Sequence, residues 1–130
     1  MKRKITTGTP WEPVVGYSRA VAAGDFVFVA GCTSMMDEKF VHEGDAYAQT
    51  TQAIANIAAA LEQFGLSLAD VVRTRMFVTD IGRWEEYGRA HGAAFREAMP
   101  ATSMIGVASL VDPRMLVEVE AVAYQAGIGR

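Results

Sequence analysis

The chain has 130 residues, of which 51% are apolar, and a formal net charge of −3 at pH 7. This length predicts a single domain over residues 1–130, with enough apolar residues for a core that needs no disulfides. Cys32 is the only cysteine, which excludes an internal disulfide and a zinc site built on several cysteines. No long basic run occurs, and this argues against broad nucleic-acid binding.

The N-terminal residues and the length of the apolar runs indicate the cellular compartment of the protein. The basic residues 2–4 are followed by Thr, Gly, Pro and Trp instead of a hydrophobic signal segment. No apolar run approaches the roughly 20 residues that are needed to cross a membrane. We therefore expect a cytoplasmic protein in a reducing compartment, with no membrane partner.

The first half of the chain is predicted to form a loop, two strands and a helix. Residues 6–16 are rich in Gly, Pro and Thr and favour the loop, and two short strands follow at 18–23 and 26–30. The second strand is apolar on both faces, so we expect it to be covered on both sides. Residues 45–64 carry an apolar stripe at helical spacing, with Asp45 as a capping residue and Gly65 as a left-handed stop.

The second half alternates strands with one more helix. The predicted elements are a strand at 71–79, a helix at 83–98 and strands at 102–110 and 116–124. The element order is therefore β-β-α-β-α-β-β, which indicates an α+β fold with two helices on one face of a mixed sheet. Because the other face also carries apolar side chains, we expect it to pack against copies of itself in a small closed ring.

The last strand contains two acidic residues. Side chains alternate between the two faces of a strand, so Val117 and Val119 share an apolar face while Glu118 and Glu120 share the other. The acidic face meets water, a binding site or a subunit interface, and alternation alone does not decide between these.

Five segments together resemble one protein family. They are residues 17–21, 22–31, 72–81, 100–103 and 117–123, in this order and spacing. On these residues the sequence resembles the RidA/YjgF family, also labelled endoribonuclease L-PSP or reactive-intermediate deaminase. The resemblance implies a chorismate-mutase-like fold, a homotrimer and a small-molecule pocket between neighbouring subunits. It also implies hydrolysis of enamines or imines such as 2-aminoacrylate to a 2-oxo acid and ammonia, without a metal or organic cofactor.

The resemblance also assigns roles to individual residues. It places the glutamate that positions or activates water at Glu118, and pocket-shaping residues at Tyr17 and Gly31. Active members hold the substrate carboxylate with an arginine two residues after a proline, and this position is Thr102 here. One neutral hydroxyl replaces a bidentate guanidinium, and losing a charged hydrogen bond costs roughly 1.5–3 kcal/mol. The sequence therefore indicates a branch that lacks the arginine and does not carry out the standard reaction.

Four residues besides Tyr17 and Gly31 are candidates for ligand contact. Arg19 shares an extended face with Tyr17 and is a candidate to replace the missing charge, the alternative being an exposed surface arginine. The hydroxyls and amides of Thr102 and Ser103 could hold a small polar group. Cys32 follows Gly31 near the expected pocket, where it is either a contact residue or a small buried packing residue.

Three functions follow from these interpretations. The first is a hydrolase that acts on a small enamine, imine or related C–N compound, with Glu118 handling water. The second is a trimeric protein that binds a small metabolite without turnover. RNA cleavage, which the family label suggests, is the weakest because the chain is acidic and shows no basic face with interleaved aromatic residues.

Overall fold

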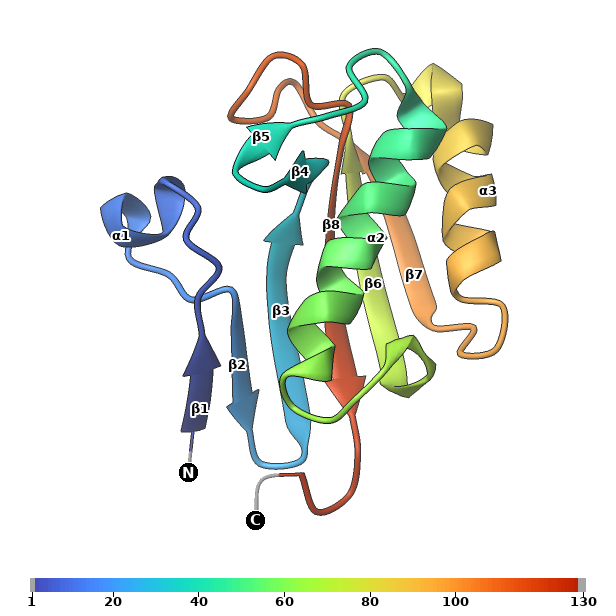
Figure 1. Ribbon diagram of the computed structural model, residues 1–130. Coiled ribbons are helices and arrows are strands. Elements are labelled where there is room, and N and C mark those ends of the chain that lie inside the picture. The colour runs from blue at the N-terminus through green and yellow to red at the C-terminus, as the bar shows by residue number, and fades with distance from the viewer. Residues whose placement is uncertain (1, 129–130) are drawn as a thin grey trace.

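The computed structural model describes residues 2–128 as a six-stranded mixed sheet with two helices on one face (Figure 1). The strand order is β1-β2-β3-β8-β6-β7, and a separate two-stranded hairpin is formed by β4 and β5. The strands are β1 (Lys2–Ile5), β2 (Ala20–Ala23), β3 (Phe26–Cys32), β4 (Met35–Met36), β5 (Lys39–Phe40), β6 (Val71–Val78), β7 (Ala101–Gly106) and β8 (Val117–Tyr124). The two covering helices are α2 (Ala46–Glu62) and α3 (Trp84–Ala94). The α+β class and the two-helix layer expected from the sequence are confirmed.

Helix α2 begins and ends where its sequence signals predict. The carboxylate of Asp45 accepts a hydrogen bond of 2.9 Å from the amide of Ala48, which satisfies one of the free donors at the helix start. Gly65 has a φ of 77°, a left-handed conformation that favours glycine, and Leu66 behind it is buried. Ile54, Ile57 and Leu61 are almost fully buried, which fixes the face that α2 turns toward the sheet.

The core is formed by the helix-covered face of the sheet. On β8 the side chains of Val117, Val119 and Ala123 have no exposed surface, while those of Glu118 and Glu120 are only partly buried. The predicted alternation of an apolar face and an acidic face is therefore confirmed. It leaves both glutamates on the face of the sheet that α2 and α3 do not cover.

Strand β6 lies between β8 and β7 and determines which groups face the two glutamates. It pairs antiparallel with β8, so that Phe77 lies opposite Glu118 and Arg75 lies opposite Glu120. It pairs parallel with β7, with Thr74 opposite Thr102. An ion pair of 2.6 Å joins Arg75 to Glu120 within the sheet.

Some predicted boundaries and one predicted loop were wrong. The expected loop at 6–16 contains a short helix, α1 (Trp11–Val15), and β1 precedes it at the edge of the sheet. The strand expected at 26–30 continues to Cys32 because irregular pairing after Val29 lets it follow β8 further. The helix expected at 83–98 ends at Ala94, and the strand expected at 102–110 spans 101–106. A strand of four residues and a helix of five give little periodicity to detect, which explains why β1 and α1 were not predicted.

The uncovered face of the sheet carries exposed aromatic side chains. Phe26 and Phe28 are 41% and 48% exposed, and Phe26 contacts Tyr124 on the neighbouring strand. The expectation that β3 is covered on both faces is thus not met within one chain. None of the described helices is long and apolar enough to cross a membrane.

Candidate functional site

A cavity of about 600 Å³ lies beside the end of β3. Its walls come from the N-terminal segment that contains α1, from the β4–β5 hairpin, from α2 and from the start of β8. The size is typical of a small-molecule site. Five of the seven residues predicted from the sequence line this cavity, namely Tyr17, Arg19, Gly31, Cys32 and Glu118.

Glu118 occupies space that is free only because residue 31 is glycine. A Cβ atom at Gly31 would overlap the carboxylate of Glu118 and would lie 2.6 Å from its Cδ and 2.8 Å from its Cγ. Side chains do not approach a Cβ this closely, so any larger residue at position 31 would displace Glu118. The requirement for glycine here is therefore one of close approach between the backbone of β3 and the side chain of Glu118.

The surroundings of Glu118 favour its neutral form. Burial raises the pKa of this carboxyl, the nearby guanidinium of Arg19 partly opposes the rise, and the charge of Glu120 adds to it. No hydrogen bond from a described residue contributes to the shift. Glu118 is thus a half-buried carboxyl that has no fixed partner and titrates closer to neutrality than an ordinary glutamate.

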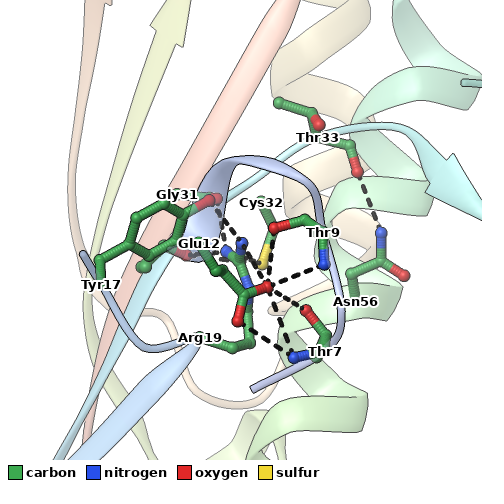
Figure 2. A network of polar contacts seen from close by, with 10 residues as sticks. Thr7, Thr9, Glu12, Tyr17, Arg19, Gly31, Cys32, Thr33 and Asn56 are labelled. Atoms are coloured by element: carbon green, nitrogen blue, oxygen red, sulfur yellow. Dashed lines mark hydrogen bonds and ion pairs between the residues drawn. The ribbon is translucent and has the colours of Figure 1, made fainter. Parts of the chain in front are cut away.

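Arg19 is buried and bound to the pocket wall, so the alternative of an exposed surface arginine is wrong (Figure 2). Its Nη1 donates hydrogen bonds of 2.6 Å to the carbonyl of Gly31 and 3.2 Å to the carbonyl of Ala30. Its Nη2 donates to the hydroxyl of Tyr17 at 3.3 Å. Arg19 therefore fixes the backbone beneath Glu118 and orients Tyr17.

The carboxylate of Glu12 is the centre of a second polar group that sequence analysis missed (Figure 2). It accepts hydrogen bonds from the hydroxyls of Thr7 and Thr9, at 2.8 and 2.7 Å, and from both of their amides. Its Oε2 lies 3.9 Å from Nη2 of Arg19. Burial raises the pKa of Glu12, but the hydrogen bonds from Thr9 and Thr7 outweigh this effect and hold it below its usual value.

A known pattern could have identified Glu12. Thr9 is followed three residues later by Glu12, which is the sequence pattern of a capping box. In the structure the cap of α1 is Pro10 and makes no side-chain cap hydrogen bond, but Glu12 still reaches back to accept a bond of 3.2 Å from the amide of Thr9. The helix that follows has only five residues, so the pattern lacks the apolar run that normally accompanies it.

Cys32 behaves as a buried packing residue that also contacts the cavity. Burial raises the pKa of its thiol to about 11, because the opposing effect of Arg19 is smaller. Its Sγ lies 3.5 Å from Nη1 of Arg19 and from the carbonyl of Ala30. A thiol that stays protonated at neutral pH is a poor nucleophile.

Thr102 and Ser103 do not line the cavity of their own chain. On β7 the hydroxyl of Thr102 lies 2.8 Å from that of Thr74, which in turn lies 2.8 Å from Nε2 of His91. Ser103 Oγ accepts a hydrogen bond of 3.3 Å from Arg73. Burial lowers the pKa of His91, so this group of side chains favours a neutral imidazole. The structure therefore does not bring these two predicted residues to Glu118 within one chain.

The wall contributed by α2 is polar but largely hydrogen-bonded. Nδ2 of Asn56 donates to the carbonyls of Thr33 and Met35, at 3.0 and 2.9 Å. Its Oδ1 accepts a hydrogen bond of 3.0 Å from Nε2 of Gln52. Within residues 2–128 no group of three or more His, Cys, Asp or Glu side chains is arranged to hold a metal ion.

Comparison with known proteins identifies the family to which this chain belongs. The family described as Endoribonuclease L-PSP matches residues 7–125. The chain belongs to this family. The RidA/YjgF family predicted from the sequence is thereby confirmed, because solved structures of the YjgF family share the fold.

Individual proteins are similar to this chain over almost its whole length. Among solved structures, Rv2704 of Mycobacterium tuberculosis, a YjgF/YER057c/UK114 family member, is 47% identical over 96% of this chain and all of its own, with a TM-score of 0.87. The uncharacterized protein SCO2049 of Streptomyces coelicolor is 39% identical over 97% of this chain and 94% of its own. The 3-aminoacrylate deaminase RutC of Acinetobacter baylyi is 33% identical over 92% of this chain and 94% of its own.

Proposed function

We propose that this chain hydrolyses a small imine or enamine and that Glu118 is its catalytic residue. The observation that carries the proposal is the half-buried carboxyl of Glu118, which lies over Gly31 in a ligand-sized cavity and has a raised pKa. A pKa nearer neutrality suits a group that must both accept and donate a proton. The similarity to a protein named as an aminoacrylate deaminase supports the same reaction class.

The chemistry needs one acid–base group. Ionised Glu118 takes a proton from water as the water oxygen bonds to the imine carbon, and the electrons of the C=N π bond move to nitrogen. The neutral carboxylic acid then returns the proton to that nitrogen. Glu118 next takes the hydroxyl proton of the carbinolamine and passes it to the amine nitrogen, while the carbonyl forms, the C–N bond breaks and ammonia leaves. An enamine first takes a proton on its β-carbon from neutral Glu118, and the resulting iminium then follows the same path.

Arg19 and Tyr17 support this step without reacting. The hydroxyl oxygen of Tyr17 accepts a hydrogen bond from Arg19, which leaves its own hydrogen free to donate to a ligand oxygen. Arg19 also opposes the rise in the pKa of Glu118, which favours the ionised form that accepts a proton from water. Thr102, which stands where active relatives have the carboxylate-binding arginine, supports a substrate other than 2-aminoacrylate.

We also propose that the working molecule is a homotrimer with its site completed by a neighbouring subunit. The exposed Phe26 and Phe28 on the uncovered sheet face give an apolar surface for such an assembly. Thr102 and Ser103, which lie away from the cavity of their own chain, would then come from the neighbour. Light scattering coupled to size exclusion tests this, and a monomer would contradict it.

The activity test is ammonia release from imines that an amine or amino-acid oxidase generates in the presence of catalase. We expect the protein to accelerate ammonia release, and Glu118→Gln to lose about 10²- to 10⁴-fold of the rate, which is the usual contribution of general acid–base catalysis. Glu120→Gln, two residues along the same face, is the matched control: it removes only the smallest contribution to the raised pKa of Glu118 and should lose far less of the rate. Turnover that persists in Glu118→Gln would remove this residue from the mechanism. Ligands that bind without any turnover would favour the alternative of a non-catalytic binding protein.

A further inference from the structure

We infer that Glu12, which does not line the cavity, is a positioning residue for Glu118 and acts on it through Arg19. Glu12 serves as the counter-ion of this cation, keeps it from pairing with Glu118, and so leaves Glu118 free to take and return a proton. The inference rests on the proposed function where it concerns a reaction. The link from Glu12 through Arg19 to Glu118 is a property of the folded chain and is also tested without turnover.

Two carboxylates share one buried guanidinium. Oε2 of Glu12 lies 3.9 Å from Nη2 of Arg19, and no other carboxylate oxygen among residues 2–128 comes within 4 Å of this guanidinium. Glu118 is farther away, yet the charge of Arg19 still acts on its carboxyl. A cation at ion-pair distance would hold Glu118 ionised and bonded. Whether Glu118 is paired or free therefore depends on where Arg19 is held and on what balances its charge.

Arg19 is held in place by neutral acceptors (Figure 2). Its Nη1 donates to the carbonyls of Gly31 and Ala30, and its Nη2 donates to the hydroxyl of Tyr17. These bonds fix the guanidinium but leave its charge uncompensated, and a buried charge needs a partner of opposite sign. Removing the charge of Glu12 should therefore leave Arg19 in place and increase its attraction for the carboxylate of Glu118.

Glu12 is surrounded by groups that keep it ionised. It is 3% exposed, and the hydroxyls and amides of both Thr7 and Thr9 donate to its carboxylate. Hydrogen bonds of this kind favour the charged form of a carboxyl. Arg19 thus has a buried counter-ion that stays negative at neutral pH.

The other ionisable groups near Glu118 do not replace Arg19 in this role. Glu120 on the same strand raises the pKa of Glu118, and Cys32 on β3 stays protonated because burial raises its pKa to about 11. Strand β6 places the apolar Phe77 opposite Glu118, and α2 contributes no charged side chain to the cavity. The remaining titratable groups of the wall are Tyr17, Asp37 and Glu38.

The pair of Glu12 and Arg19 lies within one chain. Their exposed fractions of 3% and 5% leave almost no surface that a neighbouring subunit could contact. Charges that a neighbour adds beside Glu118 would be the same in every variant below. Differences between the variants therefore report the contribution of Glu12.

The carboxyl of Glu118 can be titrated directly by ¹³C NMR. The full-length protein is labelled at the side-chain carboxyls of glutamate, and Glu118→Gln assigns the signal. Glu12→Gln should lower the titration midpoint of Glu118 by about 1 pH unit, because it removes a repelling charge and leaves Arg19 without its counter-ion. The acidic limb of the pH profile of ammonia release should move to lower pH by the same amount.

Two further variants separate charge from structure. Glu12→Asp keeps the charge but draws it back from Arg19, so the midpoint of Glu118 should lie between those of wild type and Glu12→Gln. This variant also keeps the inference testable if Glu12→Gln does not fold. Glu85→Gln removes one carboxylate from an exposed ion pair with Arg89 and is the control for net charge, which should leave the midpoint unchanged.

A purely structural role for Glu12 predicts a different result. Both Glu12 variants would then lose stability in urea while the midpoint of Glu118 stayed at its wild-type value. That outcome, or a midpoint that rises in Glu12→Gln, overturns the inference.

The two readouts distinguish this inference from the proposed function. A lowered midpoint in a protein that releases no ammonia from any imine would retain the link between Glu12 and Glu118 and remove the reaction. Ammonia release with the same midpoint and the same acidic limb in wild type and Glu12→Gln would retain the reaction and overturn the link.

Discussion

Glu118 and Glu120 lie two residues apart on the same face of β8, yet their surroundings differ completely. Glu120 is ion-paired with Arg75 across to β6 at 2.6 Å, with a third of its side chain exposed. Glu118 lies over Gly31 on β3 and receives no hydrogen bond from a described residue. The residues that face each carboxylate from the neighbouring strand, and not their position on β8, thus decide which of the two is ion-paired.

The largest expected effect comes from closing the space above Gly31. Gly31→Ala places a Cβ where the Glu118 side chain lies, so the carboxyl must move and activity should fall about 10²- to 10⁴-fold, as for Glu118→Gln. Ammonia release measures the loss. Gly92→Ala in α3, where a Cβ meets nothing within 4 Å, is the matched control and should be neutral or stabilise by about 0.5–1 kcal/mol. Unchanged activity in Gly31→Ala would show that Glu118 does not need its position over residue 31.

The next-largest effect is expected from removing the buried charge of Arg19, which binds the backbone beneath Glu118. Arg19→Met leaves Glu12 and two backbone carbonyls without their cation, and breaking a buried pair in this way costs about 3 kcal/mol of unfolding free energy. Urea denaturation measures it. Arg89→Met removes an exposed ion pair with Glu85 and should cost less than about 1 kcal/mol. Equal losses of unfolding free energy in Arg19→Met and Arg89→Met would mean that burial does not strengthen the interactions of Arg19.

Acid–base linkage predicts opposite pH trends for Glu12 and Glu118. The folded pKa of Glu12 lies below its usual 4.5, so its contribution to stability is present above pH 4.5 and is lost as the pH falls through the folded value. The folded pKa of Glu118 lies above 4.5, so its contribution is present below pH 4.5 and is lost as the pH rises through the folded value. Urea titrations of Glu12→Gln and Glu118→Gln against wild type across this range should therefore diverge in opposite directions. If stability changed with pH in the same direction for both variants, the direction of the pKa shift given for Glu12 or for Glu118 would be wrong.

The smallest effect is expected at Glu120. Its partner Arg75 is 44% exposed, and ion pairs of this kind contribute less than about 1 kcal/mol. Arg75→Met and Glu120→Gln should each change the unfolding free energy of the isolated chain by no more than this. A loss above 2 kcal/mol, measured at protein concentrations where assembly is constant, would show that the pair belongs to an interface and not to a solvated sheet face.

Periodicity was sufficient to predict the sheet, the two helices and the acidic face of β8. It was insufficient for Arg19, whose burial depends on carbonyls of β3 that lie 11 and 12 residues further along the chain. It was likewise insufficient for α1, because a helix of five residues has too few turns to show a stripe. Resemblance to a family brought Tyr17, Gly31 and Glu118 together before any geometry was known. No local pattern placed Thr102 beside Thr74, since their contact depends on the parallel pairing of β6 with β7.

The hairpin turn at the rim of the cavity holds two acidic residues in a conformation that suits other residue types better. Asp37 and Glu38 connect β4 to β5 with φ values of 50° and 66°, the mirror-image turn in which Asn-Gly is the favoured pair. Exchanging them for Asn-Gly should make the hairpin easier to form and should also remove two of the three acids that line the cavity. Replacing this turn by the consensus pair to raise heat resistance would therefore also change the charge at the rim of the cavity.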